Sequence, residues 1–218
     1  MYAFIQEVSS PLFDGIRPED RGAMLGCIGY HIGIFRKGDI VAFEAENIKH
    51  IGILLSGSVD MVKEDLWGNR TMLVRMREDE LFGETFACGE DSISTVTFMV
   101  SEDAKILFLP FNRVMHSCTM ACEFHHRLIE NMVRVIAGKN RDLTRKVEVV
   151  SKRTIREKLL AYLSIQAQIQ KSRYLEIPLG RVELAEYLCV DRSALTRELV
   201  KMKDDGLIDY DRNCFRLL

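Results

Sequence analysis

The sequence contains no apolar run long enough to cross a bilayer as a helix. A span needs about 18 or more apolar residues, and no stretch of the 218 residues approaches this length without charges. The first ten residues lack the basic start and apolar core of a secretory signal peptide. We therefore expect neither a membrane span nor a leader, and we expect a cytoplasmic protein.

Paired cysteines are also missing. The six cysteines stand at positions 27, 88, 118, 122, 189 and 214, and none forms a C-x-x-C pair. Without a leader, reduced thiols are the expected state. Cys118 and Cys122 lie one helical turn apart, so they are either a redox switch or two reduced thiols packed at the start of a helix. We favour the second interpretation.

Catalytic patterns are absent as well. We find no Ser/His/Asp arrangement, no Gly-rich phosphate loop before a helix and no metal-ligand spacing. The five histidines, at positions 31, 50, 116, 125 and 126, could supply a haem ligand, but no spacing singles one out. We interpret them as surface or hydrogen-bonded buried side chains, and we expect no enzymatic activity.

The chain has no net positive charge, because its formal net charge is -2. The charge distribution is uneven. Residues 151–218 hold 13 lysines and arginines against 10 acidic residues, whereas residues 1–150 hold 17 against 22. The C-terminal third is therefore the better candidate for binding an anionic partner.

The first half of the chain reads as a short helical segment followed by a β-rich region. Pro18, Glu19 and Asp20 are typical of a first helical turn. Short β-rich runs alternating with Gly turns predict a small barrel or roll. The expected strands are Tyr30–Phe35, Asp39–Phe43, His50–Leu55, Ser58–Lys63, Thr71–Met76, Thr95–Val100 and Lys105–Leu109.

After Pro110 the pattern becomes helical. An apolar stripe with steps of three or four residues predicts a long helix that mediates dimerisation. The alternative is a helix packed on its own roll. We favour the dimer because the apolar stripe is longer than an average helix. The stripe consists of Phe124, Leu128, Met132, Val135, Leu143 and Val147, interrupted by Lys139.

The last third predicts a winged helix-turn-helix. Two helices, Arg181–Leu188 and Arg192–Asp204, flank a short turn, and two strands, Leu207–Tyr210 and Cys214–Leu217, form the wing. Asp191 is placed to cap the second helix. This leaves an outer face that suits a DNA groove, because Arg can pair with guanine and hydroxyls can bind a base edge or a phosphate. The residues of this face are Arg192, Ser193, Thr196 and Arg197.

With these features in order, the chain resembles the Crp/Fnr family of bacterial transcription regulators. Leu54–Val59 and Phe82–Glu84 resemble the β-roll motifs of that family, and Val182–Leu188 with Asp191–Arg197 resembles its helix-turn-helix. The resemblance implies an α+β protein with a jelly-roll-like double-stranded β-helix as sensor, a long dimerisation helix and a C-terminal winged helix-turn-helix. The implied boundaries are 1–117, 118–150 and 151–218.

The resemblance also implies that Arg192, Ser193 and Arg197 occupy base-reading positions. Ser193 replaces the Glu common at its position, so we expect an operator that differs at that base pair. Cys189 stands where Gly is usual in the turn. The implied partners are a second copy of the chain, a palindromic double-stranded operator and RNA polymerase.

For the sensor, the resemblance implies an effector pocket around Gly83, Glu84, Thr85, Ser94 and Thr95. Family members that bind cyclic nucleotides carry an Arg that pairs with the phosphate, yet no Lys or Arg occurs from Gly83 to Val100. We therefore expect an effector other than cyclic AMP or cyclic GMP. Cys27 alone cannot hold the iron–sulfur cluster of other members, so we expect none.

Two functions remain open from the sequence. The first is an effector-controlled regulator that binds DNA. The second is a ligand- or redox-responsive module that regulates a protein partner, with DNA binding vestigial. Arg192 and Arg197 favour the first, and a steep salt dependence of DNA affinity would distinguish it.

Overall fold

The computed structural model describes residues 8–68, 70–89, 91–116 and 123–218. The chain forms two compact units, residues 1–137 and 138–218. Their boundary falls inside one long helix, α5 (Glu123–Val150), which the sequence analysis assigned to a segment of its own. The predicted boundary at residue 117 lies outside the described residues and stays a prediction.

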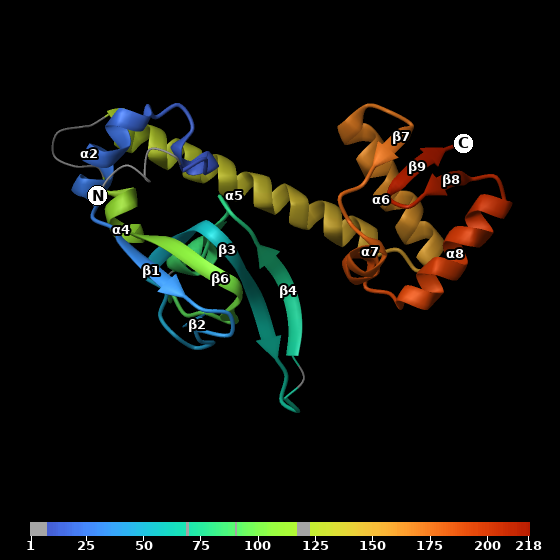
Figure 1. The fold of residues 1–218 in the computed structure, drawn as a ribbon, viewed down its shortest axis with the longest axis horizontal. Coiled ribbons are helices and arrows are strands. Elements are labelled where there is room, and N and C mark those ends of the chain that lie inside the picture. The colour runs from blue at the N-terminus through green and yellow to red at the C-terminus, as the bar shows by residue number, and fades with distance from the viewer. Residues whose placement is uncertain (1–7, 69, 90, 117–122) are drawn as a thin grey trace. The chain divides into compact units, whose positions relative to one another are not determined.

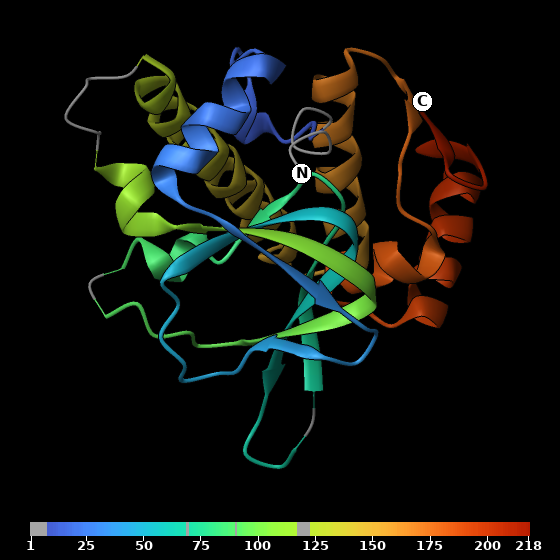
Figure 2. The same cartoon turned by 60° about the vertical axis from the view of Figure 1, so that its left-hand side comes forward.

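The N-terminal unit is built on a six-stranded antiparallel sheet that curls into a roll (Figures 1 and 2). The strands run in the order β1-β6-β3-β4, with β2 paired to β6 and β5 paired to β3. Their bounds are β1 (His31–Phe35), β2 (Ile40–Ala42), β3 (His50–Glu64), β4 (Arg70–Met76), β5 (Leu81–Phe82) and β6 (Thr97–Pro110). The predicted β-roll is confirmed.

Two of the predicted strand divisions are wrong. The segments expected as His50–Leu55 and Ser58–Lys63 form the single strand β3, and the two expected between Thr95 and Leu109 form the single strand β6. The pairing register shifts around Ser56 and Ser58 without ending either strand. Gly57, with φ +80°, lies in this bulge, and a Cβ there would overlap the backbone of Asp103. The glycine therefore marks a bulge inside a strand rather than a turn between two.

Short helices precede and follow the strands. A 3-10 turn, η1 (Pro11–Phe13), and helix α2 (Pro18–Ile28) come first, and α2 begins on Pro18 with Glu19 and Asp20 in its first turn, as predicted. Helix α3 (Glu84–Ala87) follows β5, and α4 (Phe111–Met115) follows β6. These helices lie against the sheet and bury one of its faces.

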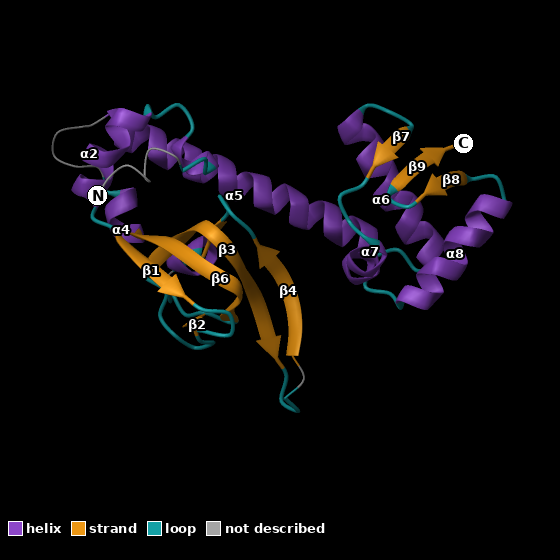
Figure 3. Cartoon of the chain, viewed as in Figure 1, coloured by secondary structure: helices purple, strands orange, loops and turns teal. Residues whose placement is uncertain are grey.

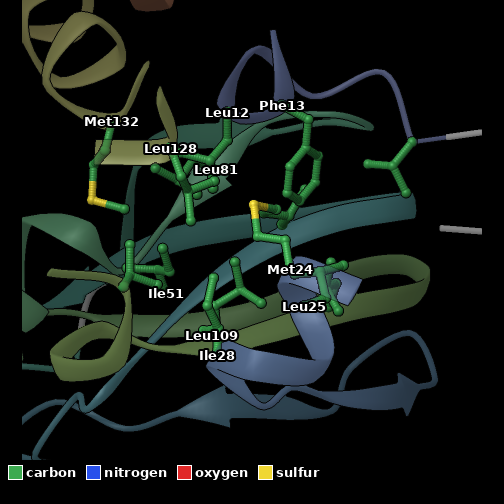
Figure 4. Packing of buried hydrophobic residues seen from close by; sticks show 14 of the residues in the cluster. Leu12, Phe13, Met24, Leu25, Ile28, Ile51, Leu81, Leu109, Leu128 and Met132 are labelled. Carbon is green, nitrogen blue, oxygen red and sulfur yellow. The ribbon is translucent and has the colours of Figure 1, made fainter. Parts of the chain in front are cut away.

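The curled sheet separates two apolar clusters. Alternate residues of a strand point to opposite faces, so Ala104 and Ile106 of β6 join the cluster inside the roll. Leu107 and Leu109 of the same strand join the cluster beneath the helices. Figure 4 shows Leu109 of the sheet beside Ile28 of α2, in the cluster that also holds Ile51 and Leu25.

The C-terminal unit begins with the second half of α5 and continues through three helices and a small sheet (Figure 3). Thr154 caps α6 (Ile155–Gln170) in a capping box with Glu157. Helices α7 (Arg181–Leu188) and α8 (Arg192–Asp204) follow, with the bounds expected from the sequence. Strands β7 (Tyr174–Glu176), β8 (Ile208–Asp211) and β9 (Cys214–Leu217) form an antiparallel sheet in the order β7-β9-β8. The winged helix-turn-helix architecture is confirmed.

Among the described residues, no helix combines the length and apolarity that a bilayer span requires.

Candidate functional site

The helix-turn-helix is held together by one buried apolar cluster. Leu184, Ala185 and Leu188 of α7 are buried against Leu195 and Leu199 of α8. Ala185 leaves room for the close approach of the two helices. The turn between them places Cys189 at φ +52°, the left-handed conformation that usually selects glycine.

The second helix begins as the sequence predicted. The carboxylate of Asp191 accepts a hydrogen bond of 2.9 Å from the backbone N–H of Ala194. This bond, followed by further bonds from Ser193, lowers the pKa of Asp191. The carboxylate therefore stays ionised and caps the free N–H groups of the first turn.

The four residues expected to read DNA share one exposed face of α8. Arg192, Ser193, Thr196 and Arg197 are all exposed, and the Thr196 hydroxyl donates to the Arg192 carbonyl at 2.9 Å. Val200, 47% exposed, extends the same face by one helical turn. The sequence analysis did not include Val200, although its spacing from Thr196 and Arg197 would have found it. Its methyl groups could contact the methyl group of a thymine.

Helix α8 is braced from behind by a cation of α6. Arg156 contacts Glu198 at 2.6 Å and Asp205 at 2.7 Å, at the middle and the end of α8. Two carboxylates on one guanidinium fix the rotation of α8 about its axis. This brace was not anticipated, because Arg156 is distant in the sequence from both carboxylates.

The wing is clamped to the first helix by Arg181. Its Nη2 donates to the Arg212 carbonyl in the wing turn at 2.7 Å. Its guanidinium also lies 5.1 Å from the ring centroids of both Tyr210 and Phe215. Burial lowers the pKa of Arg181. Such a cation–π pair is favourable in a desolvated site, so Arg181 holds the wing against α7.

The predicted effector residues do not share one environment. Gly83 and Glu84 are buried, whereas Thr85 and Thr95 are exposed. The Ser94 hydroxyl is buried and donates to the Val96 carbonyl at 2.6 Å. Backbone contacts therefore already occupy this hydroxyl.

One cation reaches this region from another strand. Lys63 of β3 donates to the Thr95 carbonyl at 2.8 Å and forms an ion pair with Glu44. The local sequence from 83 to 100 holds no cation, and sequence spacing alone could not reveal a lysine brought in by strand pairing. Because Glu44 neutralises it, Lys63 does not offer the unpaired charge that a cyclic phosphate needs.

The predicted dimer stripe divides into two parts in the structure. Leu128 and Met132 are at most 1% exposed and lie in the core of the N-terminal unit, next to Leu81 and Ile51 (Figure 4). Phe124 and Val135 pack against the same core. Assigning Leu128 and Met132 to the dimer interface was therefore wrong, because their own sheet and helices bury them, whereas Phe124 and Val135 are partly buried and their place in an interface stays a prediction. Leu143 and Val147 remain exposed at 59% and 63%.

A second apolar stripe runs along α5. It repeats with alternating steps of four and three residues, which is the heptad spacing of a two-helix seam. Val133 and Ile136 are 58% and 37% exposed, like Leu143 and Val147 further on. The full stripe is Ile129, Val133, Ile136, Asn140, Leu143 and Val147, with a single polar member.

The remaining candidate ligands form no cluster. Cys118 and Cys122 lie outside the described residues, so their redox role stays a prediction. His125 is buried, and its Nε2 lies 2.8 Å from the Arg113 carbonyl oxygen, which agrees with a hydrogen-bonded buried histidine. Within the described parts of the chain, no group of three His, Cys, Asp or Glu side chains could hold a metal ion.

Two family models match the sequence. Residues 33–118 match the cyclic nucleotide-binding domain, and residues 157–218 match the Crp-like helix-turn-helix domain. No curated protein matches it.

Several solved structures are similar to this chain in fold. The catabolite activator protein of Thermus thermophilus is 19% identical, with a TM-score of 0.51 over 96% of this chain and 94% of that one. The c-di-GMP responsive global regulator CLP of Xanthomonas campestris is 17% identical, with a TM-score of 0.59 over 90% and 96%. A CooA mutant from Carboxydothermus hydrogenoformans is 17% identical, with a TM-score of 0.60 over 86% and 83%. At these identities the likeness concerns the fold.

A sensor roll followed by a winged helix-turn-helix defines a sensor-regulated transcription regulator. The order of the two matched domains and the fold place the chain in a particular group: it belongs to the Crp/Fnr family.

Proposed function

We propose that this regulator binds a palindromic operator as a homodimer, under the control of a signal that its β-roll senses. The observation that carries the proposal is the exposed face of α8, where Arg192 and Arg197 flank Ser193 and Thr196 on a braced helix. Arg pairs bidentately with guanine in the major groove. The wing, held by Arg181, would add a second contact, to the sugar-phosphate backbone of the DNA.

The second copy would dock along α5. Heptad spacing over five apolar positions suits two parallel helices, and a single Asn inside such a seam fixes its register. The exposed fractions of Val133, Leu143 and Val147 leave more than half of each side chain without a partner in the monomer. A palindromic operator with half-sites about one turn of DNA apart would take one copy of α8 in each half-site.

The signal is proposed to be something other than a cyclic nucleotide. Beside Ser94 and Thr95, in the part of the chain that the structure describes, the cation at hand is Lys63, which is already paired with Glu44. The Ser94 hydroxyl is already bonded to Val96.

The test is the DNA affinity of Arg197→Ala, with Arg134→Ala on α5 as the matched control. Arg134 is 73% exposed, lies 3.9 Å from Glu130 and donates to the side-chain oxygen of Asn131 at 3.3 Å. We expect Arg197→Ala to lose about 1–3 kcal/mol of specific binding and to relax the preference at one base pair. Arg134→Ala should bind like the parent protein. Parental affinity and preference in Arg197→Ala would refute the assignment of this face.

A further inference from the structure

A hollow of about 280 Å³ lies at one end of the roll. Its rim is exposed and includes His31, Glu46 and Lys49, while Phe82 and Phe98 line it and are at most 4% exposed. Of the five residues expected to form the effector pocket, only Gly83 lines it. The hollow is therefore distinct from the region that the sequence analysis assigned to the effector.

Aromatic rings form much of its wall. Phe35 and Phe108 line it beside Phe82 and Phe98, and neighbouring ring centroids in this group are 5.3–6.4 Å apart. These distances are typical of edge and offset ring contacts. An added flat ring could continue the same packing.

Two glycines make room for these rings. A Cβ on Gly33 would overlap the rings of Phe35 and Phe108, and a Cβ on Gly52 would overlap the ring of Phe82. Gly33 lies in β1 and Gly52 in β3, where a glycine weakens the strand unless something approaches it closely. Here the phenyl rings approach, so the sheet is shaped to hold them in these positions.

Polar groups gather at one side of the hollow. The His31 ring stacks on Phe108 at 4.8 Å, and the His50 ring stands edge-on to His31 at 5.2 Å. Burial lowers the pKa of His50, and the charges of His31 and Lys49 lower it further. A neutral imidazole can donate or accept a hydrogen bond. Glu46 accepts a bond from the Phe43 N–H at 3.0 Å, which ties one of its oxygens to the loop.

We propose that this hollow binds a single-ring aromatic compound carrying an oxygen substituent, a carboxylate or a phenolic hydroxyl. The ring would stack among Phe35, Phe82 and Phe108, and the oxygen would meet His31, His50 and Lys49. The volume is at the lower end of that of small-molecule pockets, which favours one ring over several. The proposal rests on the proposed function, because it names the class of signal that the roll would sense.

The test is calorimetric titration of the full-length protein with three probes. Benzoate and phenol present the ring with a charged or a neutral oxygen. Cyclohexanecarboxylate keeps the acid and removes the aromaticity. We expect benzoate, phenol or both to bind, and cyclohexanecarboxylate to bind at least about tenfold more weakly than benzoate if the acid is preferred. Absence of binding by both aromatic probes at millimolar concentration would overturn the proposal.

Variants locate the bound probe. Ala42→Leu fills the hollow from β2 and should abolish binding, and the double change His31→Gln and His50→Gln should weaken it about tenfold without depending on the packing of the core. His116, the C-cap residue of α4, and Lys63, near Thr95, lie outside the lining, so His116→Gln and Lys63→Gln should bind like the parent. Loss of binding in Lys63→Gln but not in the two histidine changes would place the ligand elsewhere and contradict the proposal.

The operator affinity of the same protein preparations is also measured, because it distinguishes a failure of this proposal from a failure of the proposed function. Probe binding with no operator binding would overturn the proposed function alone. Operator binding with no probe binding would overturn the aromatic site alone.

Discussion

At the scale of single residues, Asp60 shows how a buried charge is kept in the roll. Asp60 is 6% exposed. The Arg75 guanidinium donates to its two carboxylate oxygens at 2.7 and 2.9 Å, and the Ser101 hydroxyl donates to one of them at 3.0 Å. Burial by itself would raise the pKa of Asp60, but the bonds from Arg75 and Ser101 outweigh it, so the pKa lies below its usual value. The paired carboxylate therefore stabilises the folded state.

This arrangement predicts a pH-dependent stability. A carboxylate with a lowered folded pKa contributes stability above its unfolded pKa of about 3.9, and this contribution disappears as the pH falls through the folded pKa. Asp60→Asn should lower the free energy of unfolding by about 1–3 kcal/mol at pH 7. The difference from the parent should shrink at acid pH. Urea unfolding followed by circular dichroism checks this, with exposed Glu78→Gln as control; a difference independent of pH would refute the account.

Two further predictions at the scale of single residues concern Cys189 and Gly206. Both have positive φ, +52° and +70°. A left-handed conformation costs a non-glycine residue about 1–2 kcal/mol, and the greater entropy of unfolded glycine offsets about 0.5–1 kcal/mol of that.

Cys189→Gly should therefore raise the stability of the C-terminal unit by about 0.5–1 kcal/mol. Gly206→Ala should lower it by about 1 kcal/mol, because only backbone strain opposes the new methyl group. Thermal unfolding of residues 138–218 within the full chain measures both changes. If both variants shift in the same direction, backbone conformation does not govern the stability at these two positions.

At the scale of elements, α5 carries two apolar stripes with two roles. Leu128 and Met132 face the core of their own unit, and Val133 and Ile136 face outward. The sequence pattern predicted the long helix and the first of these stripes, but not that the core of the N-terminal unit buries part of that stripe. That burial depends on where the sheet and α2 lie, and those contacts are distant in the sequence.

Contacts between residues distant in the sequence also explain the other differences between the predictions and the structure. Ser56-Gly57 is typical of a turn, and only the pairing of β3 with β6 reveals a bulge. Lys63 reaches Thr95 through strand pairing. The bounds of α7 and α8, by contrast, were predictable because local signals set them: Asp191 caps α8, and the apolar residues repeat within each helix.

The proposed dimer seam along the outward stripe can be tested by mutation. Leu143→Gln should weaken the dimer, because each of two leucines would lose about 1.5–3 kcal/mol of burial, a total of more than a hundredfold in Kd. Arg141→Gln, two residues away and off the stripe, should leave the dimer intact. Sedimentation equilibrium of both variants measures this. An unchanged dimer in Leu143→Gln would exclude the seam.

At the scale of the whole molecule, each unit contributes one part of a regulator. The N-terminal unit offers a roll with an aromatic hollow, and the C-terminal unit presents a braced helix with exposed arginines beside a clamped wing. The excess of positive charge in residues 151–218 supports DNA as the partner of the second unit.

The central claim is tested most directly by selecting operators from random DNA with the purified protein, and then measuring affinity against salt. The selection is run both without ligand and with benzoate or phenol present. We predict a palindrome whose half-sites lie about one helical turn apart, and an affinity that falls steeply with salt as counterions are released. Selection that yields no palindrome under any of these conditions, with a flat salt dependence, would contradict the account.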